Sequence, residues 1–162
     1  MSVEKVKQYF AQFGLDGKVR ELEDSSATVE LAAQALGVQG ARIAKTLSFK
    51  VGDTCVLIVT AGDAKVDNAR YKAYFAAKAK MLAADEVPEL TGHPVGGVCP
   101  FAVPKEVKVY LDESLKRFHT VFPACGSANS AIELTCGELY RYATAIEWID
   151  VCKNWQAEGE VK

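Results

Sequence analysis

Lys45 is the residue whose type and neighbours best indicate chemistry. It lies in the segment Ile43-Ala44-Lys45-Thr46-Leu47, which is rich in residues that favour β-strands. Alternate residues of a strand share a face, so Lys45 would lie beside Ile43, Leu47 and Phe49. Burial of an unpaired ammonium is costly, which makes this lysine a candidate for stabilising negative charge in a reaction. A lysine that simply faces water remains the alternative from residue types alone.

A second candidate is the loop 91–100, which carries Gly92, Gly96 and Gly97 and is stiffened by two prolines. Adjacent glycines let a backbone approach a ligand and expose its N–H and C=O groups. The spacing is neither that of a dinucleotide-binding motif nor that of a P-loop, which argues against a nucleotide-cofactor enzyme. A structural turn between a helix and a strand would explain the same residues.

The remaining polar and small residues predict no second reaction centre. Cys125 stands in the small-residue stretch 123–130, which predicts either a shallow pocket wall or a tight connection between strands. His93 and His119 have no evident partner and read as structural or solvent-facing. The five cysteines form no C-x-x-C and no zinc spacing, so we expect buried thiols, no metal and no cofactor.

The chain of 162 residues has a net charge of −2, but the charge is unevenly distributed. Residues 40–80 hold eight Lys or Arg against three Asp, and the remainder holds eleven positive and eighteen negative residues. A basic middle could steer a phosphate-rich ligand to one face, although ordinary surface lysines would give the same pattern. The N-terminus lacks the apolar core of a signal peptide and no stretch is long enough for a membrane span, so we expect a cytoplasmic protein with no membrane partner.

Helical and strand patterns alternate along the chain, with a hairpin as the clearest signal. The segments 43–50 and 54–61 flank a Gly-Asp turn. Further strands are predicted at 107–111, 119–122 and 130–134, a helical turn at 112–116, and helices at 2–13, 28–36, about 68–77, 85–90, 136–143 and 145–153. This order predicts one α+β domain, with helices packed around a mixed, largely antiparallel sheet.

Taken in order, several short segments resemble the YbaK family, which includes the editing domain inserted in bacterial prolyl-tRNA synthetases. They cover about residues 25–142 and comprise Lys45-Thr46-Leu47, Val56-Leu-Ile-Val-Thr-Ala-Gly-Asp63, Thr91-Gly92-x-x-x-Gly96-Gly97-Val98-x-Pro100-Phe101, Val109-x-x-Asp112-x-Ser114-Leu115, and Gly126 ahead of Ile132-Glu133-Leu134. The resemblance implies a barrel-like sheet within a single domain over 1–162. The N-terminal helix and the segment after about residue 143 fall outside it.

The resemblance also implies an activity, namely hydrolysis of the ester that joins a wrong, small amino acid to a tRNA, on tRNA-Pro or a related tRNA. Lys45 would be the catalytic residue, with a water or the substrate itself as the attacking group. The implied substrate-binding residues are Gly92, Gly96, Gly97, Val98, Ala124 and Gly126, and the basic helix residues Arg70, Lys72 and Lys78 would meet the tRNA.

Two points qualify that expectation. Some relatives carry a serine where Ala124 stands, two residues before Gly126, and this departure weakens the case for a cysteinyl substrate. A non-catalytic module that binds tRNA or an aminoacyl-tRNA synthetase on the same fold is the alternative, because a fold does not fix a function.

Overall fold

The computed structural model of the chain describes residues 2–22 and 28–155. Its helices are α1 (Ser2–Ala11), α2 (Val29–Leu36), α3 (Asn68–Phe75), α4 (Glu86–Thr91) and α5 (Cys136–Tyr142), with the short 3-10 turns η1 (Asp16–Lys18), η2 (Gly40–Arg42) and η3 (Glu113–Arg117). Its strands are β1 (Arg20–Glu21), β2 (Ile43–Val51), β3 (Thr54–Ala61), β4 (Lys65–Val66), β5 (Lys108–Asp112), β6 (Thr120–Pro123), β7 (Ser130–Ala131), β8 (Leu134–Thr135), β9 (Glu147–Ile149) and β10 (Cys152–Lys153).

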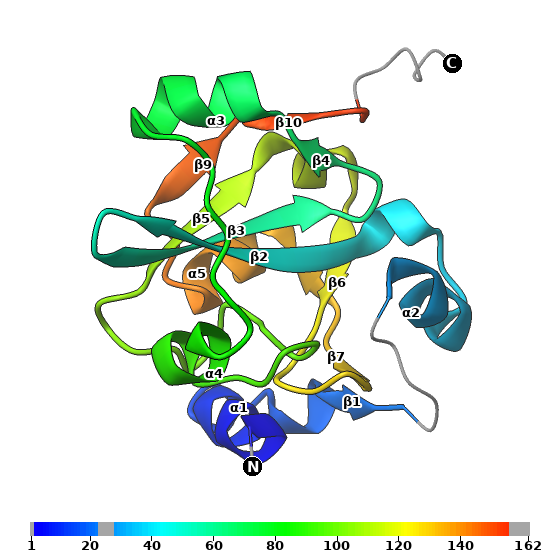
Figure 1. The fold of residues 1–162 in the computed structure, drawn as a ribbon. Helices are drawn as coiled ribbons and strands as arrows, with labels where there is room; N and C mark the ends of the chain where they lie inside the picture. Colours follow the sequence, from blue (N-terminus) through cyan, green and yellow to red (C-terminus); the bar gives the residue numbers. More distant parts are fainter. Residues whose placement is uncertain (1, 23–27, 156–162) are drawn as a thin grey trace.

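Six strands form the central sheet, in the order β8-β6-β2-β3-β5-β9 (Figure 1). The neighbours β2–β3 and β6–β8 are antiparallel, whereas β2–β6, β3–β5 and β5–β9 are parallel. The sheet is mixed and curled, and helices surround it, which confirms the predicted α+β class. Two further pairs, β1–β7 and β4–β10, are antiparallel ribbons at its margins.

The predicted hairpin is confirmed as β2 and β3, paired from Val51↔Thr54 to Ala44↔Ala61. Gly52 occupies the tight turn with φ 60°, a backbone conformation that glycine adopts without steric cost. All residues of β3 from Cys55 to Ala61 are buried, so both faces of this strand are covered. The run of β-branched residues between 54 and 61 suits such a strand.

Helix ends follow their capping residues. The Thr28 hydroxyl accepts a hydrogen bond from the Leu31 N–H, and α2 ends at Gly37 in the left-handed conformation. Asp67 caps α3 through the N–H groups of residues 69 and 70. Thr135 and Glu138, three residues apart, form the capping box of α5. Ser25 and Ser26 also have the residue type of a helix cap, but residues 23–27 lie outside the described residues.

The predicted helix at 145–153 is wrong, because this segment forms β9 and β10. The chain leaves α5 through Thr144 at φ 47°, which stops the helix. The segment then pairs with the open edge of β5, where Ile149 is buried, and the Asp112 carboxylate accepts a hydrogen bond from the Val151 N–H. The strand predicted at 130–134 is divided into β7 and β8, which pair with β1 and β6.

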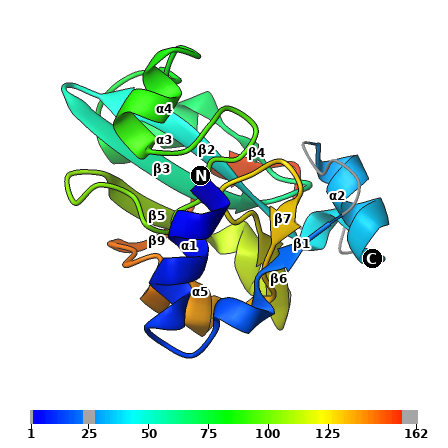
Figure 2. The same cartoon turned by 90° about the horizontal axis from the view of Figure 1, so that it is seen from below.

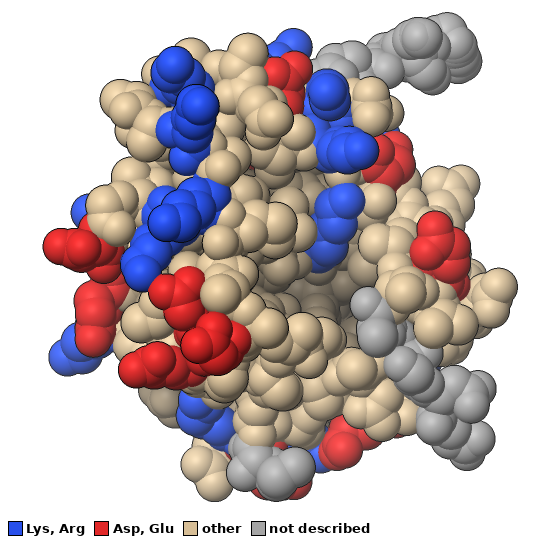
Figure 3. Space-filling model, viewed as in Figure 1, with Lys and Arg blue, Asp and Glu red and all other residues tan. Residues whose placement is uncertain are grey.

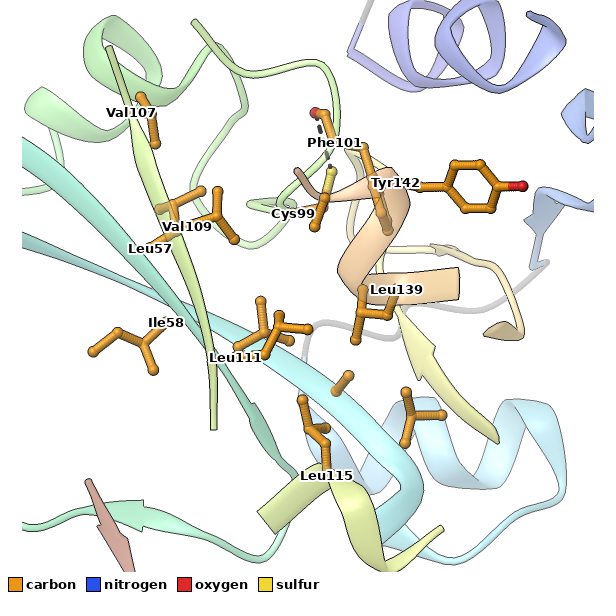
Figure 4. Packing of buried hydrophobic residues seen from close by; sticks show 14 of the residues in the cluster. Leu57, Ile58, Cys99, Phe101, Val107, Val109, Leu111, Leu115, Leu139 and Tyr142 are labelled. Carbon is orange, nitrogen blue, oxygen red and sulfur yellow. Dashed lines mark hydrogen bonds between the residues drawn. The ribbon is translucent and has the colours of Figure 1, made fainter. Parts of the chain in front are cut away.

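The main core lies between the sheet and α5. Figure 4 shows Leu57, Val109 and Leu111 of the sheet facing Leu139 and Phe101, all of them buried. Figure 2 shows α1 beside α5, and a hydrogen bond of 2.6 Å from the Tyr9 hydroxyl to the Tyr142 carbonyl joins the two helices. Phe10 of α1 packs edge-on against Phe101, with ring centroids 4.8 Å apart. None of the helices described is long and apolar enough to cross a membrane.

Candidate active site

A cavity of about 310 Å³ lies between α2, the outer edge of β2 and two loops. Four residues singled out from the sequence line it together, Lys45, Gly96, Val98 and Ala124. The face in Figure 3 is hollowed at its centre, between α2 and the loop that follows α4. Other lining residues are Thr28, Val29, Ala32, Leu36, Ile43, Ala44, Thr46, Leu47, Phe122, Ser130 and Ala131.

The cavity exists because β2 lacks a neighbouring strand along part of its outer edge. At one end, Ile43 and Ala44 pair with β6. At the other end, the Lys50 N–H donates to the Lys80 carbonyl at 2.8 Å and Ser48 accepts from the Leu82 N–H at 3.2 Å. Residues 45–47 therefore border open space rather than another strand.

Lys45 is half-buried at this opening. Burial lowers the pKa of its ammonium, and this effect is opposed by nearby Cys152 and Asp63. Within the described part of the chain, nothing accepts a hydrogen bond from this ammonium or pairs with it, whereas Lys50 is held 2.8 Å from Glu86. Asp63 is itself bound by Arg117, with N–O distances of 2.9 and 2.5 Å. Lys45 is thus a cation available to a ligand that carries or develops negative charge.

The glycines of the two loops have different positions. Gly96 lines the cavity at φ 90° and is exposed, so its backbone is open to a ligand. Gly97 is buried, and a Cβ placed on it would lie 2.8 Å from the N and Cα atoms of Ser127. Gly126, at φ 99°, packs in the same way against Ser2. Gly92 ends α4 in the left-handed conformation. Gly97 brings the two loops together, Gly126 packs against α1, and none of these three glycines lines the cavity.

Two hydroxyl groups of the cavity lining are already used, and one is not. The Ser130 hydroxyl accepts from the N–H groups of Cys125 and Ser127, both at 3.2 Å, and Thr28 caps α2. The Thr46 hydroxyl is buried and has no hydrogen-bond partner among the described residues. Thr46 therefore contributes an unsatisfied polar group beside Lys45.

Sequence reasoning missed the cavity wall that α2 supplies. Val29, Ala32 and Leu36 follow an i, i+3, i+7 spacing, which marks one face of the helix, and all three line the cavity. That apolar face was readable, but nothing in the sequence said that it covers β2 next to Lys45.

The predicted tRNA-binding residues lie on and near α3. Arg70 donates to Asp150 at 2.9 Å, which occupies part of its guanidinium. Lys72 and Lys78 are exposed and flank a second hollow of about 440 Å³ with Asn68, Ala69 and Ala79. Figure 3 shows basic side chains gathered over this part of the molecule.

The surroundings of His93 and of the buried cysteines indicate structural roles rather than catalytic ones. Both ring nitrogens of His93 are engaged, since Nδ1 lies against the Ser2 hydroxyl and Nε2 donates to the Phe101 carbonyl at 2.7 Å. Burial lowers the pKa of His93 and raises that of Cys99 to about 12, which keeps both groups neutral. Burial also raises the pKa of Cys125. His119 is exposed. No group of three metal-ligating side chains occurs among the residues in the described ranges.

Residues 23–142 match the family of aminoacyl-tRNA editing domains. The protein YwhH of Bacillus subtilis is 55% identical over 157 residues, which cover 96% of this chain and 100% of YwhH. The proline–tRNA ligase of Thermosipho melanesiensis is 35% identical over 107 residues, 64% of this chain and 19% of the ligase.

A solved structure of a candidate trans-editing enzyme for prolyl-tRNA synthetase superposes with a TM-score of 0.85 at 29% identity, over 94% of this chain and 97% of that one. Since the family match spans well over half of the residues, this chain belongs to the aminoacyl-tRNA editing domain family.

Proposed function

We propose that the chain is a trans-editing deacylase, which hydrolyses the ester between a small, wrongly attached amino acid and its tRNA. The observation that carries this proposal is the half-buried Lys45, whose ammonium has no partner in the described part of the chain and borders a cavity. The candidate trans-editing enzyme that matches over 97% of its own length supports action in trans.

The chemistry requires little activation, because an aminoacyl ester is already reactive. A water molecule adds to the ester carbonyl, whose oxygen becomes negatively charged. The intermediate then collapses, the bond to the ribose oxygen breaks, and the products are the free amino acid and a tRNA with its 3′-terminal hydroxyl groups restored. The Lys45 ammonium would stabilise the developing oxyanion more strongly in this poorly hydrated position than in water.

The walls of the cavity suit a small aminoacyl group. Its volume is about 310 Å³ and most of its lining side chains are apolar, which limits the size of the side chain that fits. The exposed Lys72 and Lys78 would contact phosphates of the acceptor stem. A synthetase that hands over the charged tRNA is the further partner we propose.

The test is a deacylation assay with a panel of mischarged tRNAs, including alanyl-, seryl- and cysteinyl-tRNA-Pro. We expect the wild-type chain to release at least one amino acid. Replacing Lys45 with Ala should slow release about 10²–10³-fold, the usual loss when one oxyanion-stabilising group is removed. Lys105→Ala, an exposed lysine in the loop before β5, is the matched control and should retain full activity.

Two results would refute the proposal. Full activity in Lys45→Ala, with folding intact, would remove Lys45 from its role. Salt-dependent binding of tRNA without hydrolysis of any charged tRNA in the panel would identify a non-catalytic binding module instead.

A further inference from the structure

Part of the outer edge of β2 carries backbone N–H and C=O groups that pair with no other segment of the described chain. In an antiparallel pair, the N–H and C=O groups of successive residues point alternately toward and away from the partner strand. Ser48 and Lys50 direct theirs away from β3, since both bond to the segment 80–82. Thr46 has the same phase, two residues before Ser48, so its N–H and C=O groups also point away from β3.

Those two backbone groups of Thr46 have no partner in the described ranges, because β6 pairs only as far as Ala44 and the segment 80–82 begins to pair at Ser48. Thr46 lines the cavity, and Gly96, Val98 and Ala124 also line it. Its side-chain hydroxyl is unsatisfied as well. The two backbone groups border the cavity and the hydroxyl is buried, so a ligand in the cavity would supply the partners that Thr46 lacks.

An aminoacyl ester carries the complementary groups. In a hydrogen-bonded antiparallel pair, one residue donates its N–H to the carbonyl of its partner residue and accepts the N–H of that same residue. The α-amino group and the carbonyl of a single aminoacyl moiety are such a donor and acceptor. Peptides that add a strand to a sheet edge use the same contacts over several residues.

We propose that the aminoacyl moiety pairs with Thr46 as a one-residue extension of the sheet. The Thr46 N–H donates to the carbonyl oxygen of the substrate, and the Thr46 C=O accepts from its α-amino group. This inference rests on the proposed function and extends it. It makes Thr46 a substrate-binding residue through its main chain, and it defines the substrate class as esters of amino acids whose α-amino group is free.

Binding is tested first, independently of hydrolysis. The probe is adenosine with alanine attached through a 3′-amide, which cannot be hydrolysed like an ester, and its matched control carries propionyl, which lacks only the amine. We expect the alanyl probe to shift the Thr46 amide signal in nitrogen-15 NMR spectra and to bind at least tenfold more tightly than the propionyl probe. Equal affinities, or an alanyl complex that leaves the Thr46 amide signal unchanged, would overturn the inference.

Variants test the same contact in the reaction. Thr46→Pro removes the N–H, and an edge position without a ladder bond tolerates proline. Thr46→Val keeps both main-chain groups and removes only the hydroxyl. We expect Thr46→Pro to lower the single-turnover rate about 10²-fold and Thr46→Val to lower it no more than about tenfold, because only the hydroxyl is lost. If Thr46→Val loses as much as Thr46→Pro, the side chain and not the main chain is the binding group. A thermal unfolding midpoint for each variant separates these effects from misfolding.

The outcomes also separate this inference from the proposed function. If the wild-type chain deacylates tRNA and depends on Lys45, but both probes bind equally, only the pairing at Thr46 is wrong. If the alanyl probe engages Thr46 and no charged tRNA is hydrolysed, the binding mode stands and the hydrolytic function falls.

Discussion

Replacing Gly97 with Ala should disturb the site without touching any residue of the cavity wall. An added Cβ would lie 2.8 Å from the N and Cα atoms of Ser127, where ordinary contacts begin at 3.4 Å, so the two loops must separate by about 0.6 Å. Misplacement of about 1 Å can cost 10²-fold in rate, and we therefore expect a tenfold to hundredfold loss. The crowding should also destabilise the fold by about 1–3 kcal/mol.

The assay combines single-turnover deacylation with thermal unfolding. Gly137→Ala is the control, because its added Cβ would meet only the Thr135 hydroxyl, 4.0 Å away at the start of α5. That variant should gain about 0.5–1 kcal/mol, as glycine is a poor helix former, and keep its activity. If Gly97→Ala matched the wild type in both rate and melting temperature, close packing of the two loops would not position the site.

Three further predictions follow from charge and burial. Lys45→Met should raise the melting temperature while slowing deacylation as much as Lys45→Ala does, since burial opposes the charged form, and a lower melting temperature would contradict this. The lowered pKa of His93 means that the unfolded chain binds more protons below about pH 6.5, so stability should fall as pH decreases through that value. His93→Asn should flatten this dependence, and an unchanged dependence in that variant would contradict the prediction. Lys72→Gln and Lys78→Gln should each reduce the slope of log Kd for tRNA against log salt by about one, and an unchanged slope would exclude phosphate contacts there.

Local signals in the sequence were sufficient for much of the fold. The β2–β3 hairpin forms as predicted, and the caps at Thr28, Asp67 and Thr135 have residue types that favour this position, because turn and capping chemistry depends only on neighbouring residues. The helix predicted after α5 was wrong for the opposite reason, because the structure of that segment depends on distant residues. Residues 145–153 are strands because β5 offers an open edge, and the existence of that edge depends on the whole sheet.

For the candidate site too, local residue types predicted some features, whereas others depend on the whole fold. Residue types alone singled out Lys45 as a cation that apolar neighbours would partly bury, and it is half-buried beside a cavity. The sequence could not show that Gly96 borders the cavity whereas Gly97 packs closely in the interior, because this depends on where Ser127 lies. The open edge at Thr46 was also hidden, since it arises from two segments that stop pairing at different points of β2.

The part of the chain outside the family match is tied to the part inside it. Residues 23–142 match the family, yet Ser2 of α1 contacts His93 and packs against Gly126, and Phe10 is fully buried. An excised 23–142 fragment would lose these contacts and leave aromatic surface open to water. Transplanting the matched stretch into another host protein would therefore require substitutes for both flanking segments. Such chimeras should be designed on the 2–155 boundaries rather than on family boundaries.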